Sequence, residues 1–436
     1  MITKSNQILE KFFFYIVISL PILFIFGSAI LNISIFVLNI VFIIHVLSNK
    51  NFDYFVQNRF YFTFLLIYLA FQIVNNITNQ NYLYFDKSLY YIRFLILPLV
   101  FKYFTRFIKF DFYKISKFYL IILIFIFLDL IYQYKFDVNL LGFQPGLFNP
   151  GENIYERYAG VFNQELVMGS YLSSFGFLII TIFYNFNKKN DYVLLILLGL
   201  LFFSIFITGE RSSLFIFLIS IFFIFVFIKH LRKKFIFLGA LIFIISIIGI
   251  NVNDQLKLRY YDYPISVLLH EDDFKNDKKI KINFSPISSY SNFINKTHWG
   301  MHYKTAGEMF KEKPLGGYGF KQFRIKCKNY SYLFEKDFLK ASAKIDGCST
   351  HPHNYILEIL SEQGILGFLI LLFLVFYVVR DSLKITNHRV YILFLFSIIL
   401  GYMLPIKPSG SIISTWFSSI FWLMLSFSYI KSKNSL

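Results

Sequence analysis

The sequence has little charge and almost no cysteine. Asp, Glu, Lys and Arg make up 16% of its 436 residues, whereas a soluble domain carries about 25%, and only two residues are cysteines. Hydrophobic residues account for 56% of the chain, and 59 Phe with 31 Tyr bring the aromatic share to 21%. No soluble core of this length needs so much apolar surface. The composition therefore excludes a soluble enzyme, a disordered protein, a fibre and a nucleic-acid-binding domain, in spite of the net charge of +18.

Long apolar runs are what the chain has in abundance. None shows the alternation of a strand, and a backbone within lipid must satisfy its own hydrogen bonds, so the runs predict membrane-spanning helices. We expect an all-α, polytopic membrane bundle of about twelve helices. The first two runs favour a tight helical hairpin over a cleaved signal peptide. The chain has no internal repeat of the kind found in many transporters. The twelve runs are 12–28, 30–47, 60–75, 89–105, 118–134, 166–184, 192–208, 212–228, 235–250, 362–379, 390–405 and 411–429.

Lys and Arg in the connections predict the orientation. With the N-terminus inside, the inside connections hold 20 of these residues and the short outside connections hold 5, so both termini are expected to be cytoplasmic. One long polar connection then lies outside. The expected organisation is a nine-helix region over 1–250, a largely helical outside loop over 251–356, and three C-terminal helices over 357–436.

Both cysteines, Cys327 and Cys348, fall in this outside loop. In an oxidising compartment two such residues predict a disulfide, with free thiols as the alternative. The disulfide would connect the segment after Arg324 to the segment just before His351.

The densest polar motif follows Cys348 directly and reads Ser-Thr-His351-Pro-His353-Asn354. At the start of a helix on the membrane surface, His353 is suited to act as a general base. From spacing alone, capping of that helix by His353 and Asn354 is an equal alternative.

Two arginines occupy short outside connections. Arg211 follows Gly209-Glu210 in a turn of barely four residues, and Arg157 lies with Glu165 just before the helix expected at 166–184. Arginines that face a cavity are suited to bind phosphate oxygens, although an interfacial arginine can also simply extend its charge toward water.

Five motifs in this order resemble the O-antigen ligase and polymerase superfamily of bacterial envelope glycan assembly, over roughly residues 155–375. They are Arg157-Tyr-Ala-Gly-Val-Phe-Asn-Gln-Glu165, Thr208-Gly-Glu-Arg211-Ser-Ser, Pro314-Leu-Gly-Gly317-Tyr-Gly319, Cys348-Ser-Thr-His-Pro-His353-Asn354 and Gly364-Ile-Leu-Gly367.

The resemblance implies a metal-independent glycosyltransferase of the bacterial inner membrane that needs no cofactor. Its donor would be a glycan on polyprenyl diphosphate, usually undecaprenyl diphosphate. The acceptor hydroxyl would be on lipid A-core for a ligase, in lipopolysaccharide synthesis, or on a lipid-linked repeat for a polymerase. Arg211 would hold the diphosphate and His353 would help to deprotonate the acceptor. Family members often carry a further arginine in the large periplasmic loop, and the candidates for its role here are His298, His302, Lys304 and Arg324, with Asn354 and His351 beside the site.

Other hypotheses have weaker support in the sequence. His298 and His302 have the spacing of a metal site but lack an acidic partner, and the cluster Glu271-Asp272-Asp273 is typical of a solvated surface. A flippase for lipid-linked oligosaccharides would use Arg93, Asp129 and Glu165 along a path, but we expect Arg93 and Asp129 to be paired within the bundle. Ligation is favoured over polymerisation, and glycosylation of a protein is a third possibility.

Overall fold

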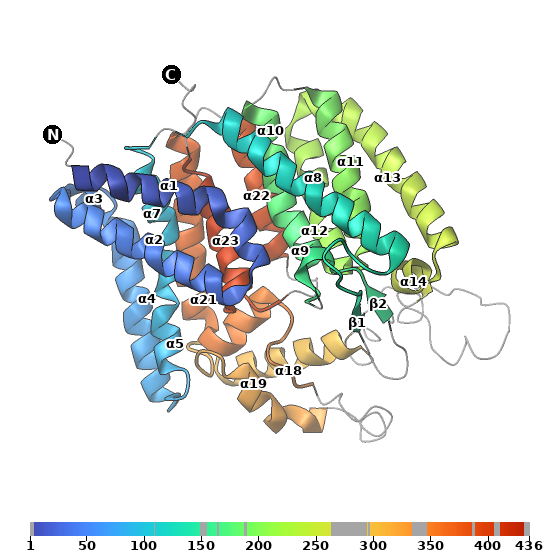
Figure 1. Cartoon of the computed structure of the whole chain (residues 1–436). Coiled ribbons are helices and arrows are strands. Elements are labelled where there is room, and N and C mark those ends of the chain that lie inside the picture. The colour runs from blue at the N-terminus through green and yellow to red at the C-terminus, as the bar shows by residue number, and fades with distance from the viewer. Residues whose placement is uncertain are drawn as a thin grey trace.

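The structure is a computed structural model that describes residues 4–108, 110–148, 155–163, 165–186, 190–262, 294, 297–333, 347–385, 389–404 and 410–430. The expected acidic cluster at 271–273 lies outside these residues. Nearly all of the described secondary structure is helical (Figure 1). The two short strands pair antiparallel, with Gly146 opposite Arg157. An all-α membrane fold is confirmed.

The elements of the first half of the chain alternate long helices with short ones. In order they are α1 (Lys4–Ile25), α2 (Ser28–Ser48), α3 (Asp53–Gln57), α4 (Arg59–Thr78), α5 (Phe85–Tyr90), α6 (Ile92–Leu95), α7 (Leu97–Phe104), α8 (Phe112–Phe136), β1 (Gly146–Phe148), β2 (Tyr155–Arg157), α9 (Met168–Tyr171) and α10 (Phe177–Phe186). Helices α1 and α2 pack as the expected hairpin, with the turn at Gly27.

The second half contains further apolar helices and the short helices of the long polar connection. In order they are α11 (Asp191–Ile207), α12 (Arg211–Phe227), α13 (Arg232–Val252), α14 (Asp254–Lys257), α18 (His298–Glu312), α19 (Phe323–Lys326), α21 (Tyr355–Ile385), α22 (Arg389–Met403) and α23 (Thr415–Phe427).

Most of the expected membrane helices are present at nearly the expected bounds. Among the described residues, seven helical segments are long and apolar enough to cross a membrane: Asn6–Ile25, Ser28–Ser48, Arg59–Thr78, Phe112–Phe136, Met168–Phe186, Lys229–Val252 and Tyr355–Lys384. Helices α11, α12, α22 and α23 are apolar but shorter. The run at 89–105 is broken into α5, α6 and α7. Twelve spans therefore stay a prediction.

The break in this run has an identifiable cause. Pro98 lies in the first turn of α7, where it removes a backbone donor that a continuous helix would use. Side chains from neighbouring helices bond to carbonyls of the broken region: Tyr61 donates to the carbonyl of Leu95, and Asn39 donates to that of Arg93. Such side-chain donors allow an interrupted helix to persist where water is excluded.

Helix α23 lies at the centre of the bundle. It packs against α2, α7, α21 and α22, and nearly all of its residues are buried. Ser419 and Ser426 donate to carbonyls one turn back, which satisfies these hydroxyls inside an apolar environment. Helix α13 is instead mostly exposed and lies at the edge of the bundle in Figure 1.

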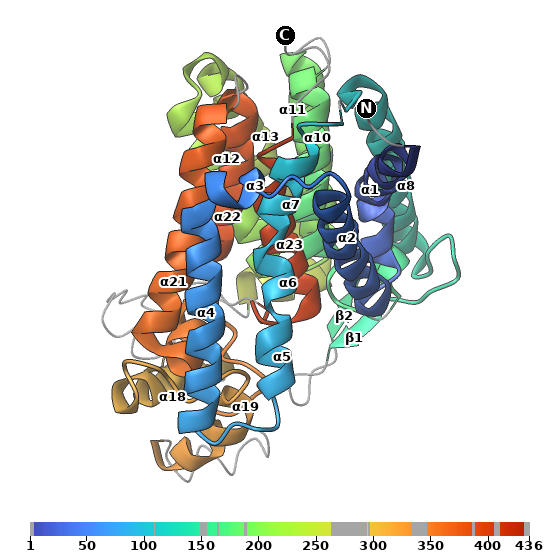
Figure 2. The same cartoon turned by 90° about the vertical axis from the view of Figure 1, so that its left-hand side faces the viewer.

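The two ends of the bundle differ in what they carry. Figures 1 and 2 place both chain termini at one end and α18 and α19 at the other. Contacts at the end that carries the termini agree with this arrangement, because Asn6 bonds to Asn49, and Lys102 forms an ion pair with Asp381. Helix α18 packs against α21 at the opposite end, where the predicted site residues gather.

Candidate active site

A tight turn connects α11 to α12 and presents Arg211 as the first residue of α12. Gly209 in this turn has a φ of +69°, and Glu210 follows it directly before the helix. The Glu210 side chain is buried and accepts hydrogen bonds from the backbone N–H of Gly169 at 2.9 Å and from the Ser213 hydroxyl at 2.9 Å. A Cβ atom at residue 169 would lie 2.8 Å from the Cβ of Glu210, so only glycine allows this approach. The turn is thus held by the segment that begins α9.

Three arginines surround this turn, and we call Arg157, Arg211 and Arg259 the arginine group. Arg157 forms an ion pair with Glu210 at 3.5 Å, and Arg259 donates from Nη2 to the carbonyl of Gly209 at 3.0 Å. The Arg211 guanidinium lies 5.2 Å from the centre of the Trp299 ring of α18. Three guanidinium groups therefore gather at one turn, and Glu210 forms an ion pair with Arg157.

Tyr260 reports the electrostatics of the arginine group. Its hydroxyl donates to the carbonyl of Phe206, and its ring stacks on that residue. Burial raises the pKa of the Tyr260 phenol, while the positive charge of Arg259 acts in the opposite direction. Glu210 raises this pKa further, and Arg157 and Arg211 lower it. A single phenol thus interacts with all three arginines.

The His-Pro-His-Asn motif forms a turn that leads into α21. Asn354 is buried, and its side-chain oxygen accepts from the backbone N–H groups of Ile356 and Leu357 at 3.1 Å each. Capping by Asn354 is thereby confirmed. His353 does not cap the helix, because it adopts a left-handed φ of +55° and its Nε2 lies 3.3 Å from the Ser349 hydroxyl. Such a backbone conformation in a non-glycine residue is strained and is found often at functional sites.

Three imidazoles meet at this turn, and we call His302, His351 and His353 the histidine group. The ring of His353 lies 4.1 Å from that of His351 and 5.4 Å from that of His302, which is buried on α18. The Tyr303 hydroxyl is 3.5 Å from the carbonyl of His353. Helix α18 therefore contacts the histidine turn through two successive residues.

Helix α18 also connects the two groups. Trp299 contacts Arg211, and His302 contacts His353. These two residues of α18 are three apart, a spacing that makes side chains neighbours on one helix face. Arg211 and His353, which are 142 positions apart in the sequence, thus lie on the same side of the molecule with one pair of side chains between them.

The Pro-Leu-Gly-Gly motif supports the histidine group through backbone contacts. Helix α21 is interrupted at Gly364, whose φ is +61°, and the neighbouring N–H of Ile365 donates to the carbonyl of Pro314 at 2.8 Å. A Cβ at residue 364 would lie 2.2 Å from the carbonyl oxygen of Leu315. The buried Glu362 carboxylate accepts from the N–H of Lys321 on the same segment. Both glycine motifs thus shape the backbone where the loop packs on α21.

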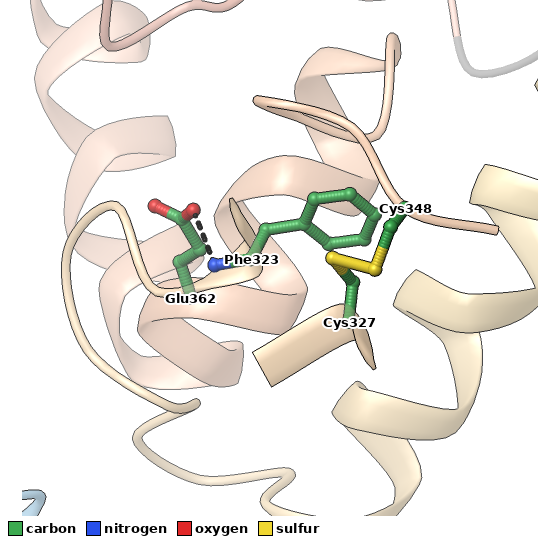
Figure 3. The surroundings of a disulfide bond; sticks show 4 residues. All are labelled: Phe323, Cys327, Cys348 and Glu362. Atoms are coloured by element: carbon green, nitrogen blue, oxygen red, sulfur yellow. Dashed lines mark hydrogen bonds between the residues drawn. A yellow bond between two sulfur atoms is a disulfide. The ribbon is translucent and has the colours of Figure 1, made fainter. Parts of the chain in front are cut away.

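A disulfide between Cys327 and Cys348 completes this support. It connects the end of α19 to the segment directly before the histidine turn. In Figure 3 the Phe323 ring lies beside the disulfide, and its backbone N–H donates to Glu362 at 3.0 Å. The histidine turn is therefore connected covalently to the loop that packs on α21.

The other expected site residues lie in different surroundings. Lys304 donates to the carbonyl of Leu333, and the Arg324 guanidinium lies over the ring of Tyr84 at 5.7 Å. Position 298 begins α18, and its side chain lies outside the described part of the structure. Glu165, which a flippase would use along a path within the bundle, is instead exposed in the connection that precedes α9 at Met168.

The expected partners within the bundle are found, but not as one pair. Arg93 donates to Asn32 at 2.8 Å, and Asp129 accepts from the N–H of Leu140 at 3.0 Å. Within the described residues, no group of three His, Cys, Asp or Glu side chains is placed to hold a metal ion.

Comparison with known families adds one decisive match. Residues 194–372 match the family model described as O-Antigen ligase. This part of the chain is similar to the O-antigen ligase family. The match includes Arg211, both cysteines and His353, and it confirms the resemblance to the ligase and polymerase superfamily. Similarity to the O-antigen ligase family supports a ligase-type or polymerase-type enzyme acting on lipid-linked glycans in a membrane. No curated protein matches the chain.

Two residues of the site were missed by sequence reasoning. Glu210 has the turn's only carboxylate and holds Arg157, yet it was treated only as part of the turn. Arg259 was not among the candidates for a further loop arginine, which were His298, His302, Lys304 and Arg324, because it lies within ten residues of the end of α13. An arginine followed by two tyrosines just beyond a membrane helix was the available signal.

Proposed function

We propose that this protein transfers a glycan from polyprenyl diphosphate, such as undecaprenyl diphosphate, to an acceptor hydroxyl at the periplasmic face of the bacterial inner membrane. We propose further that the acceptor is lipid A-core, so that the reaction is O-antigen ligation in lipopolysaccharide synthesis. The observation that carries the proposal is the contact of α18 with Arg211 through Trp299 and with His353 through His302.

The arginine group supplies the charge that the leaving group requires. A diphosphate leaves with two negative charges or more, and guanidinium groups bind phosphate oxygens in bidentate geometry without a metal. Arg211 also stands at the N-terminus of α12, where unpaired backbone N–H groups favour an anion. Because Glu210 fixes Arg157, this part of the group is positioned before the donor binds.

The histidine group supplies the base. The acceptor oxygen forms the new bond to the anomeric carbon, the bond from that carbon to the diphosphate oxygen breaks, and the acceptor proton passes to the imidazole of His353. Polyprenyl diphosphate is released with the bonding electrons. His302 and His351 lie against the His353 ring and limit its orientation.

The arrangement of the chain supports the proposed orientation. Both termini lie at one end of the bundle and the candidate site at the other (Figures 1 and 2), as expected for cytoplasmic termini and a periplasmic loop. A site at the rim of a membrane bundle suits a donor with a hydrocarbon tail, because the tail can remain in the bilayer.

Reconstitution tests the proposal. The full-length protein in liposomes is given lipid-linked glycan together with either lipid A-core or a second lipid-linked unit. Extension of lipid A-core is the expected result, and both R211A and H353A should abolish it while the proteins still accumulate in the membrane. Extension of the lipid-linked unit alone would identify a polymerase. Movement of the lipid-linked glycan across the bilayer without transfer would refute the enzymatic proposal.

A further inference from the structure

A second positively charged site lies apart from the arginine and histidine groups. A cavity of about 540 Å³ opens between α2, the α5–α6 region and the loop around Lys321. Residues that line it include Asn32, Ile33, Phe36, Lys87, Arg93 and Lys321. No member of the arginine or histidine group is among the lining residues, so the cavity is a separate feature of the molecule.

The cavity is cationic. Lys87, Arg93 and Lys321 line it, and no carboxylate is present among the described residues of its lining. Burial lowers the pKa of the Lys321 ammonium, and the positive charges of Arg324 and Lys87 lower it further, whereas Glu362 and Glu358 raise it. Three cations, Lys87, Arg93 and Lys321, therefore line one space.

The carboxylates behind the cavity do not neutralise these cations by direct ion pairs. Glu358 accepts from the Ser411 hydroxyl and from the N–H of Ile412, and Glu362 accepts from the N–H groups of Lys321 and Phe323. In the part of the chain that the structure describes, Lys87, Arg93 and Lys321 form no ion pair. The carboxylates instead fix the backbone that presents Lys321.

Arg93 is oriented by neutral groups. Its Nε donates to the Asn32 side chain at 2.8 Å, and its Nη1 donates to the carbonyl of Tyr90 at 2.6 Å. These contacts hold a guanidinium at the wall of the cavity without cancelling its charge. A guanidinium held in this way is suited to bind an anion with several oxygens.

One wall of the cavity is apolar and continues along the outside of the bundle. Ile33 and Phe36 line it and are 62% and 53% exposed. Ile40 and Ile44 continue the same face of α2 at helical spacing and are also exposed. In a membrane this face contacts hydrocarbon chains, so the cavity joins a cationic pocket to a lipid-facing surface.

We propose that this cavity binds the anionic phosphate head group of a lipid whose hydrocarbon chains lie along α2. The required chemistry is a phosphate with net negative charge on an apolar tail, supplied either by an anionic phospholipid of the bilayer or by a polyprenyl phosphate. The site does not depend on the proposed transfer reaction, because it uses none of the groups assigned to that reaction.

The test is a binding measurement on the full-length protein in detergent. Native mass spectrometry records the apparent Kd for phosphatidylglycerol, undecaprenyl phosphate and neutral phosphatidylcholine, each added alone. Wild-type protein should bind at least one anionic lipid about tenfold or more tightly than phosphatidylcholine. The double variant R93Q/K321Q should lose this preference. R93K should keep most of it because it keeps the charge, and K135Q, which removes an exposed lysine of α8, should leave it unchanged.

Each outcome is decisive. Selective binding of phosphatidylglycerol assigns the site to membrane phospholipid, and selective binding of undecaprenyl phosphate assigns it to the isoprenoid. Equal affinity for anionic and neutral lipids, or unchanged affinity in R93Q/K321Q, would overturn the proposal. The midpoint of thermal unfolding checks whether R93Q/K321Q is folded. If R93Q/K321Q is not folded, the lipid preference of R93K, which keeps the positive charge, tests the site instead. Since no glycan transfer is measured, failure here is distinct from failure of the proposed function.

Discussion

The arginine group and the histidine group are built in different ways. Side-chain contacts hold the arginine group, with Glu210 paired to Arg157 and accepting from the backbone at Gly169. Backbone constraints hold the histidine group: a cap at Asn354, a left-handed residue at 353 and a disulfide at 348. The proposed anion-binding charge is thus positioned by a counter-charge, whereas the proposed base is positioned by the path of the backbone.

The largest effect is expected when the proposed base, His353, is removed. H353A should reduce kcat for glycan transfer by about 10²–10⁴, the range typical of general-base catalysis, with little change in donor KM. Added imidazole should restore part of the lost rate. Transfer assays in liposomes measure both effects. H230A, which removes an exposed histidine next to α13, is the matched control and should behave as wild type. An H353A variant with normal kcat would exclude His353 from the mechanism.

Removal of Arg211, the proposed phosphate-binding cation, should lower activity nearly as much. R211A is expected to lower kcat/KM for the lipid-linked donor by about 10²–10³, because stabilisation of the developing charge is lost. Imidazole should not rescue it, and R211K should retain more activity than R211A. The control is R380A, which removes an exposed arginine near the C-terminal end of α21. This is the end of the helix at which Lys384 lies. Imidazole rescue of both R211A and H353A would contradict the division of roles between the two groups.

Most of the helices could be predicted from the sequence because a lipid environment leaves so few choices for the backbone. Apolar runs at 30–47, 60–75 and 235–250 correspond to α2, α4 and α13 within a few residues. The break of the run at 89–105 has one local signal, Pro98, but Pro98 alone does not show that the run divides into three short helices. The broken helix is also stabilised by donors such as Tyr61, which come from another helix and cannot be read from the run itself.

The members of the candidate site were proposed from sequence motifs, but the contacts between them were not. His353 and Arg211 were identified by motif, yet the contact through Trp299 and His302 depends on how α18 packs against α21. Hydrophobic periodicity does not encode that packing. A flippase would use Glu165 along a path within the bundle, whereas α9 begins at Met168 and Glu165 is exposed in the connection before it.

A test of the backbone constraint alone is the substitution of Gly364. G364A forces a left-handed alanine and a close contact with the carbonyl of Leu315, so the free energy of unfolding should fall by about 3 kcal/mol or more. The control G307A lies in α18 with open space around its Cβ and should be neutral or slightly stabilising. The midpoint of thermal unfolding in detergent compares the two. Equal stability of G364A and G307A would show that the interruption of α21 does not need glycine.

Removal of the disulfide should weaken the histidine group and leave the arginine group unchanged. C348S removes the disulfide, which joins residues 21 positions apart in the sequence. By chain entropy its contribution to the free energy of unfolding is about 3 kcal/mol. We expect kcat to fall by about tenfold because the histidine turn loses its connection to α19, with donor affinity unchanged because the arginine group is untouched. Single-turnover assays and donor-binding measurements separate the two quantities. A matching loss of donor affinity would mean that the two groups are not independent.

The smallest expected effect concerns the far end of α18. Glu312 accepts a hydrogen bond from the Tyr330 hydroxyl, and this bond, followed by one with Tyr318, lowers the pKa of the Glu312 carboxyl. A lowered pKa in the folded state adds stability above the pKa of the unfolded chain, about 4.3, and this contribution disappears as the pH falls through the folded-state pKa.

Because Glu312 is exposed, the contribution should be below about 1 kcal/mol. E312Q should therefore unfold at a slightly lower temperature than wild type at pH 7, and the difference between the two midpoints should shrink at pH 4 and approach zero at still lower pH. The arginine group is held by other contacts, so donor affinity at pH 7 should be the same in both proteins. A midpoint difference that stays constant from pH 7 to pH 3 would mean that α18 is anchored without the ionised carboxylate.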